Sequence, residues 1–99
     1  MKKILFANDC SDLQQSINQE LTKDGYRVTC VSDMDAIWEY LKTVRPDLVL
    51  IDLYINGFEG HSLLYNIKEK YQNLPVLVCG LQTPNSLENL REVMDYVNI

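Results

Sequence analysis

The sequence predicts an α/β fold in which helices cover both faces of a parallel sheet. Apolar, strand-like runs alternate with segments of helical periodicity along the chain, and two of those runs are apolar without interruption. Alternation of this kind indicates a parallel sheet with right-handed crossovers. Continuous apolar runs are typical of strands that are covered on both sides. The chain has 99 residues and no repeat or linker, so residues 1–99 are expected to form a single domain.

The first strand and the first helix are predicted at KKILFA (residues 2–7) and SDLQQSINQELTKDG (residues 11–25). Apolar side chains recur every four residues in the helix and form one stripe, which consists of Leu13, Ile17 and Leu21. Ser11 with Gln14 three positions later resembles a capping box. Gly25 suits the left-handed end of a helix.

The second strand and the second helix are predicted at YRVTCV (residues 26–31) and SDMDAIWEYLKTV (residues 32–44). The strand alternates with period two, as a strand buried mainly on one side does, so we expect it at a sheet edge. Ser32 is the expected cap of the helix, and Pro46 prevents the helix from continuing.

The rest of the chain continues the alternation with a strand, a loop, a helix, a strand and a helix, at DLVLIDL (47–53), INGFEG (55–60), HSLLYNIKEKY (61–71), PVLVCG (75–80) and NSLENLREVM (85–94). The last segment, DYVNI (95–99), is either a short final strand or the frayed end of the preceding helix. Periodicity over so short a segment does not separate these two readings.

Composition excludes several classes of function. The net charge of −5 argues against nonspecific binding to nucleic acid or to anionic lipid, because both need a basic surface. No apolar run is long enough to span a membrane, and the N-terminal run is too short for a signal peptide. The cysteines (Cys10, Cys30 and Cys79) form no CxxC pair, and there is one histidine. We therefore expect reduced thiols in a cytoplasmic protein and no zinc site.

Polar residues gather at the predicted carboxyl ends of the strands. Asn8 and Asp9 follow the first strand, Asp52 ends the third, and Gly80 ends the fourth. If the first and third strands are neighbours, Asp9 and Asp52 converge at one edge of the sheet. Two carboxylates held together repel each other, and oxygen ligands of this kind suit Mg²⁺. An aspartate can also attack phosphorus and carry an acyl phosphate.

Each acid also has a purely structural reading, Asp9 as a capping acid of the first helix and Asp52 as a strand-end residue. The pair on adjacent strand ends is better explained by a site. Other chemistries fit poorly, because the chain has no GxGxxG, GxxxxGK[ST] or GxSxG motif.

At this point the sequence resembles the receiver domain of bacterial two-component response regulators. The resemblance lies in four segments, KKILFANDCSDL (2–13), DGYRVTCVSDMDAIWEYL (24–41), PDLVLIDLYINGFEGHSLLYNIK (46–68) and LPVLVCG (74–80). It implies a CheY-like, flavodoxin-like fold, a three-layer doubly wound parallel sheet with strand order 2-1-3-4-5. In this chain the fifth strand is expected to be short or incomplete and the fifth helix to be absent.

The resemblance also implies the roles of individual residues. Asp52 falls on the phosphoacceptor, which a histidine kinase or a phosphotransfer protein would phosphorylate. Asp9 falls on a direct Mg²⁺ ligand, Tyr54 would lend the metal its backbone carbonyl, and Asn8 would reach the metal through water. Such a domain is not an enzyme, and at most it catalyses its own phosphorylation and dephosphorylation.

The chain departs from the family pattern at several positions. Asn8 stands where the family usually has an acid, which is expected to weaken Mg²⁺ binding. Asn56 replaces a loop proline, and Gly80 stands where a switch Ser or Thr usually binds a phosphoryl oxygen. The family also has a lysine at the end of the fifth strand, whereas no lysine follows Lys70 here.

These departures keep two alternatives open. The chain is either a phosphorylatable receiver or a degenerate receiver that acts as an interaction or dimerisation module without phosphorylation. A further possibility is that it is the front part of a longer regulator, whose missing fifth helix would expose apolar surface and favour a homodimer.

Overall fold

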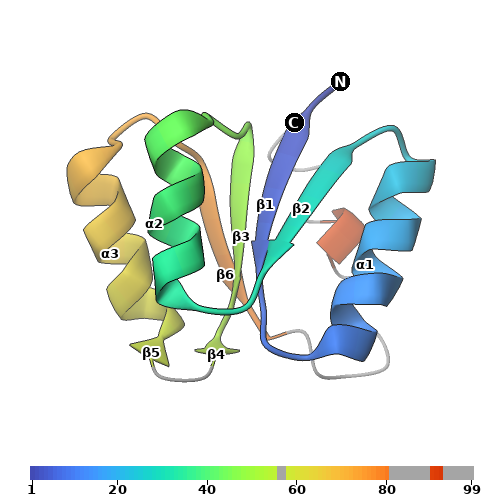
Figure 1. The fold of residues 1–99 in the computed structure, drawn as a ribbon, viewed down its shortest axis with the longest axis horizontal. Coiled ribbons are helices and arrows are strands. Elements are labelled where there is room, and N and C mark those ends of the chain that lie inside the picture. Colours follow the sequence, from blue (N-terminus) through green and yellow to red (C-terminus); the bar gives the residue numbers. More distant parts are fainter. Residues whose placement is uncertain (56–57, 81–89, 93–99) are drawn as a thin grey trace.

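A computed structural model, which describes residues 1–55, 58–80 and 90–92, shows a parallel sheet between layers of helices (Figure 1). The sheet consists of β1 (Lys3–Ala7), β2 (Arg27–Val31), β3 (Leu48–Asp52) and β6 (Val76–Cys79). Its order is β2-β1-β3-β6, which confirms the predicted fold class and the predicted order of the first four strands. The predictions for the fifth strand and the fifth helix lie outside the described residues.

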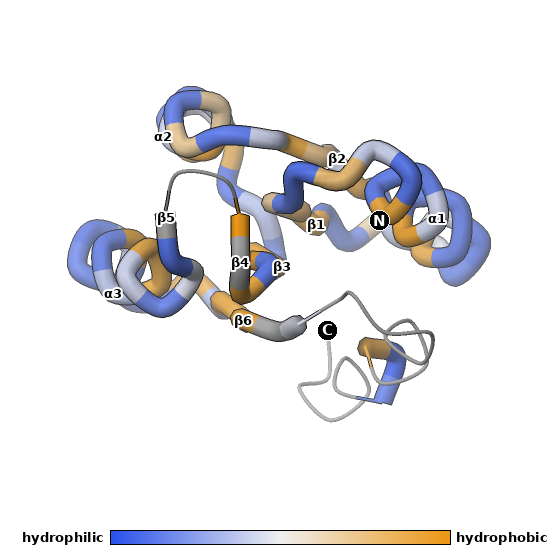
Figure 2. The backbone as a smooth tube through the Cα atoms, turned by 90° about the horizontal axis from the view of Figure 1, so that it is seen from below, coloured by the Kyte–Doolittle hydropathy of each residue, from blue (hydrophilic) through white to orange (hydrophobic). Residues whose placement is uncertain are grey.

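Helices cover the sheet on both sides (Figure 2). The helices α2 (Met34–Thr43) and α3 (Gly60–Lys70) lie over one face, and α1 (Ser11–Lys23) lies over the other. The helical residues 90–92 lie beside α1 on its face. No helix in the described part of the chain is both long and apolar enough to cross a membrane.

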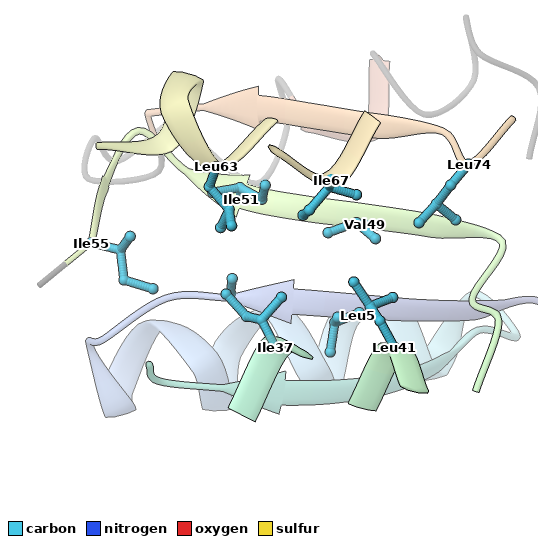
Figure 3. Close-up of a cluster of buried hydrophobic side chains, with 10 residues drawn as sticks. Leu5, Ile37, Leu41, Val49, Ile51, Ile55, Leu63, Ile67 and Leu74 are labelled. Carbon is cyan, nitrogen blue, oxygen red and sulfur yellow. The ribbon is translucent and has the colours of Figure 1, made fainter. Parts of the chain in front are cut away.

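The central strand β3 contributes to two apolar cores. Val49 and Ile51 point toward α2 and α3, where they pack with a cluster that includes Leu5, Ile37, Leu41, Leu63 and Ile67 (Figure 3). Leu48 and Leu50 point to the opposite face and pack with Ile17 and Leu21 of α1. Every residue of β3 is buried, which explains why this run of the sequence has no polar alternation.

The edge position predicted for YRVTCV is confirmed, because β2 pairs only with β1 among the described strands. The left-handed helix end at Gly25 is confirmed as well, with a φ of +93°. The backbone N–H of Gly25 donates to the Thr22 carbonyl at 3.1 Å, and that of Tyr26 donates to the Leu21 carbonyl at 3.0 Å. These bonds close the last turn of α1.

The two predicted helix caps are wrong. Cys10, not Ser11, is the residue before α1, and it makes no side-chain capping bond. The Gln14 side chain instead reaches the strand ends, where it donates to the Asn8 carbonyl. The N-terminal cap of α2 is Asp33 and not Ser32. The Asp33 carboxylate accepts a hydrogen bond from the Ala36 N–H at 2.8 Å.

The segment INGFEG, predicted as a loop, takes part in an antiparallel strand pair that begins at Tyr54. The short strands β4 (Tyr54–Ile55) and β5 (Phe58–Glu59) pair with each other directly after β3. Ile55 is buried in the core beneath α2 and α3, which gives this segment an anchor that its polar composition does not suggest. The loop position Asn56 lies outside the described residues.

Residues 90–92 close part of the α1 face of the sheet. Leu90 is buried against Ile17 and Leu21 of α1. The Arg91 guanidinium pairs with the Glu20 carboxylate at 2.7 Å and with the Asp24 carboxylate at 3.3 Å. These residues are helical, as predicted, and the remainder of the predicted helix (85–94) lies outside the described residues.

Candidate functional site

The carboxyl ends of β1 and β3 bring Asn8 and Asp52 together. The two strands are hydrogen-bonded neighbours in the register Ala7–Ile51, so the next residues of each strand lie side by side. The Asn8 amide nitrogen Nδ2 donates to Asp52 Oδ2 at 2.5 Å, and both residues are 0% exposed. The prediction that the first and third strands are neighbours is therefore confirmed.

Asn8 is held by hydrogen bonds on all sides. Its backbone N–H donates to the Val31 carbonyl at 3.0 Å, and its backbone carbonyl accepts from Gln14 Nε2. Its side-chain oxygen Oδ1 accepts from the Cys10 N–H at 2.6 Å. Because a backbone N–H can only be met by the amide oxygen, the amide nitrogen must be the group that faces Asp52.

Gln14 is a residue of the site that sequence reasoning missed. From α1 its Nε2 donates to the Asn8 carbonyl, and it lies 3.4 Å from the Val31 carbonyl and 3.2 Å from Ser32 Oγ. It thus joins the end of β1 to the end of β2. The sequence offered one signal, a glutamine three residues after Ser11, and that signal also fits a capping box.

The other predicted metal ligands lie at the same edge of the sheet. Asp9 follows Asn8 directly and is exposed. The backbone of Tyr54 is part of β4, two residues beyond Asp52, where it pairs with Glu59. With Asp52, these positions bring carboxylate and backbone carbonyl oxygens to one edge of the sheet, and such oxygens are ligand types that Mg²⁺ uses. No group of three or more His, Cys, Asp or Glu side chains in the described ranges is arranged to hold a metal ion.

Gly60 lets α3 begin against the end of β3. A Cβ at Gly60 would lie 2.9 Å from the Asp52 carbonyl oxygen and 3.0 Å from Val78 Cγ1, which is closer than side chains pack. The Gly60 N–H donates to the Leu53 carbonyl at 3.1 Å. Glu59 caps the helix, and the bond from the His61 N–H lowers the pKa of the Glu59 carboxyl. Sequence reasoning missed Gly60, because only the fold brings these atoms together.

Gly80 presents the opposite situation at the end of β6. The residue is exposed, and a Cβ added there would meet no atom of the described residues within 4 Å. The position therefore has room for a side chain, and the sequence supplies none. No hydroxyl is available from residue 80 itself.

Comparison with known proteins identifies the family and agrees with the fold. The sequence profile of the response regulator receiver domain matches residues 4–96. The DNA-binding transcriptional regulator NtrC of Bradyrhizobium sp. (strain RP501 Parasponia) is 32% identical over 79 residues. That match covers 80% of this chain and 16% of the regulator, so the chain spans a small part of this relative's length.

Solved structures of receivers superpose closely on the chain. CheY4 of Vibrio cholerae matches with a TM-score of 0.85 and 19% identity over 98% of both chains. TrrA of Thermotoga maritima, solved in complex with Mg²⁺-BeF, matches with a TM-score of 0.81 and 18% identity over 96% of this chain and 98% of TrrA. TrrA in complex with the histidine kinase ThkA gives a TM-score of 0.84 and 17% identity over 100% of both chains. With the fold and the sequence profile in agreement, this chain belongs to the response regulator receiver domain family of two-component signalling.

Proposed function

We propose that this receiver accepts a phosphoryl group on Asp52 from a histidine kinase or a phosphotransfer protein. The observation that carries the proposal is the position of the Asp52 carboxylate at the carboxyl end of the central strand. It accepts a hydrogen bond from Asn8, which follows the neighbouring strand β1. In the reaction a carboxylate oxygen attacks phosphorus, the nitrogen–phosphorus bond of the donor breaks, and an acyl phosphate forms. Beyond this self-phosphorylation and the hydrolysis of the acyl phosphate, which returns Asp52 and releases inorganic phosphate, we expect no enzymatic activity.

The cation proposed for this step is Mg²⁺. Asp9, Asp52 and the Tyr54 backbone carbonyl would hold it, with Asn8 contributing through water. The cation would offset the negative charge of the carboxylates and of the phosphoryl oxygens. The support for this proposal is the chemistry of Asp9, Asp52 and the Tyr54 carbonyl, which offer oxygen ligands at one edge of the sheet, together with the Mg²⁺-BeF complex of the similar protein TrrA.

The partner proposed for the domain is a histidine kinase, since the similar protein TrrA forms a complex with one. We place the domain in the cytoplasm, and we propose no nucleic-acid or membrane contact for it because its charge is −5. The homodimer predicted from an open α1 face stays a prediction, and Leu90 covers part of that face.

Intact-mass measurement after incubation with acetyl phosphate and Mg²⁺ tests the phosphoacceptor role. We expect the wild-type protein to gain one phosphoryl group and Asp52→Asn to gain none. Asp47→Asn is a matched control, because it removes a carboxylate at the opposite end of β3 and should leave the adduct intact. A folded wild-type protein that gains no phosphoryl group, or a variant at Asp52 that still gains one, would contradict the proposal.

A degenerate receiver that works without phosphorylation is the second candidate. Two observations favour it, because Asp52 is fully buried and Gly80 provides no hydroxyl for a phosphoryl oxygen. If this candidate holds, Asp52→Asn will leave partner binding and signalling unchanged. Loss of signalling in a folded Asp52→Asn protein would instead count for the phosphoacceptor.

A further inference from the structure

We infer that the Asn8 amide compensates the buried charge of Asp52 in the unphosphorylated, metal-free protein, so that the acidic pocket of this domain folds stably before any cation binds. The inference concerns the same site as the proposed function, but it requires no phosphoryl transfer. Its consequence is specific: an aspartate at position 8 would make the stability of the fold depend on a divalent cation.

The buried carboxylate of Asp52 needs electrostatic compensation. Asp52 is 0% exposed, and a buried carboxylate is costly unless donors or opposite charge compensate it. Asn8 Nδ2 is a donor placed at 2.5 Å from Asp52 Oδ2, within the same buried region. A hydrogen bond to a charged group contributes more than one between neutral groups, so this amide offsets part of the cost of burial.

Hydrogen bonds fix the orientation of the Asn8 side-chain amide. The Cys10 N–H occupies its oxygen at 2.6 Å, which leaves the nitrogen directed at Asp52. Val31 and Gln14 fix the backbone of Asn8 from both sides. The donor is therefore already in position in the folded protein, and it needs no ion to orient it.

An aspartate at position 8 would exchange the amide NH₂ group for a carboxylate oxygen. Asn8→Asp would replace the donor with a carboxylate oxygen in contact with Asp52, while its other oxygen could still accept from the Cys10 N–H. Two buried carboxylates at this distance repel each other and call for a cation between them. Mg²⁺ binds such carboxylates through oxygen ligands and stabilises whichever state it binds.

Thermal unfolding of the full 99-residue chain with a chelator and with millimolar Mg²⁺ tests the inference. In chelator we expect Asn8→Asp to unfold at least about 5 °C below the wild type, and Mg²⁺ to restore most of that difference. The wild type should shift by less than about 2 °C on addition of Mg²⁺. Asn18→Asp is the matched control, since it makes the same exchange on α1, where its oxygen still accepts from Thr22 Oγ1; it should not respond to Mg²⁺.

A reciprocal exchange keeps the test decisive if Asn8→Asp does not fold. The double variant Asn8→Asp/Asp52→Asn places the carboxylate on β1 and the amide on β3, so the hydrogen bond persists with its direction reversed. We expect it to unfold within about 3 °C of the wild type in chelator and to respond to Mg²⁺ no more than the wild type does.

Two results would overturn the inference. One is a wild type that gains as much from Mg²⁺ as Asn8→Asp does, because the amide would then not compensate the charge of Asp52 before a cation binds. The other is a double variant that is no more stable in chelator than Asn8→Asp. Both are measured on unphosphorylated protein, so they can be told apart from a failure of Asp52 to accept phosphate.

Discussion

The two sides of Asp52 are built in different ways. On the β1 side, Asn8 is fixed by the Cys10 N–H, by the Val31 carbonyl and by Gln14, and it donates directly to Asp52. On the β6 side, Gly80 is exposed and has no side chain to offer. The two neighbours of the acid therefore differ: Asn8 brings a direct contact to Asp52, whereas Gly80 adds no side chain beside it.

Removal of the Asn8 side chain should produce the largest loss of stability. Asn8→Ala removes one hydrogen bond from the buried Asp52 carboxylate and the acceptor of the Cys10 N–H. We expect a loss of about 2–4 kcal/mol in the free energy of unfolding, measured by chemical denaturation. Asn66→Ala on the exposed face of α3 is the control, with an expected change within about 0.7 kcal/mol. Equal losses of stability in Asn8→Ala and Asn66→Ala would mean that the hydrogen bonds of Asn8 stabilise the fold no more than an exposed asparagine does.

Alanine substitutions at Gly60 and Gly80, the two glycines beside the site, form a matched pair, and Gly60→Ala should give the second largest loss of stability. Gly60→Ala forces a methyl group against the Asp52 carbonyl oxygen at 2.9 Å, so we expect a loss of about 1–3 kcal/mol from overpacking. Gly80→Ala places the same methyl group in open space and should change stability by less than about 0.5 kcal/mol. Denaturation of both variants under one condition gives the difference directly, and similar losses would contradict the open space at β6.

Gln14 should give the smallest of the three effects. Gln14→Ala removes a donor from the carbonyl of Asn8 but leaves the Asn8–Asp52 bond in place, and we expect a loss of about 1–2 kcal/mol. Gln15→Ala, at the exposed neighbouring position of α1, should change stability by less than about 0.5 kcal/mol. If Gln14→Ala and Gln15→Ala lose the same free energy of unfolding, Gln14 does not stabilise the strand ends, and Asn8 is positioned by Cys10 and Val31.

The sequence allowed the sheet and the position of Asp52 to be predicted, because both depend on burial. The uninterrupted apolar run of β3 indicates a central strand that is buried on both faces, and the alternating sequence of β2 indicates a strand at the edge of the sheet. Caps were harder to predict, since Ser32 and Asp33 are adjacent residues that can both cap a helix, and only the path of the backbone selects Asp33.

Contacts that join distant segments were beyond sequence reasoning. Gln14 carries the spacing of a capping box, but the carbonyl of Asn8 competes for its amide once α1 lies beside the end of β1. Gly60 sits in an unremarkable loop sequence, and its lack of a side chain gains meaning only where α3 meets β3. The direct bond from Asn8 to Asp52 likewise depends on the register of β1 against β3.

The burial of β3 on both faces has a mechanical consequence for the acid at its end. Protein interiors are close-packed and transmit strain, so a strand held between two cores behaves as a stiff rod. Val49 and Ile51 pack against the layer of α2 and α3, while Leu48 and Leu50 pack against the layer of α1. Any displacement of Asp52 along the strand axis would therefore reach both surfaces of the domain at once.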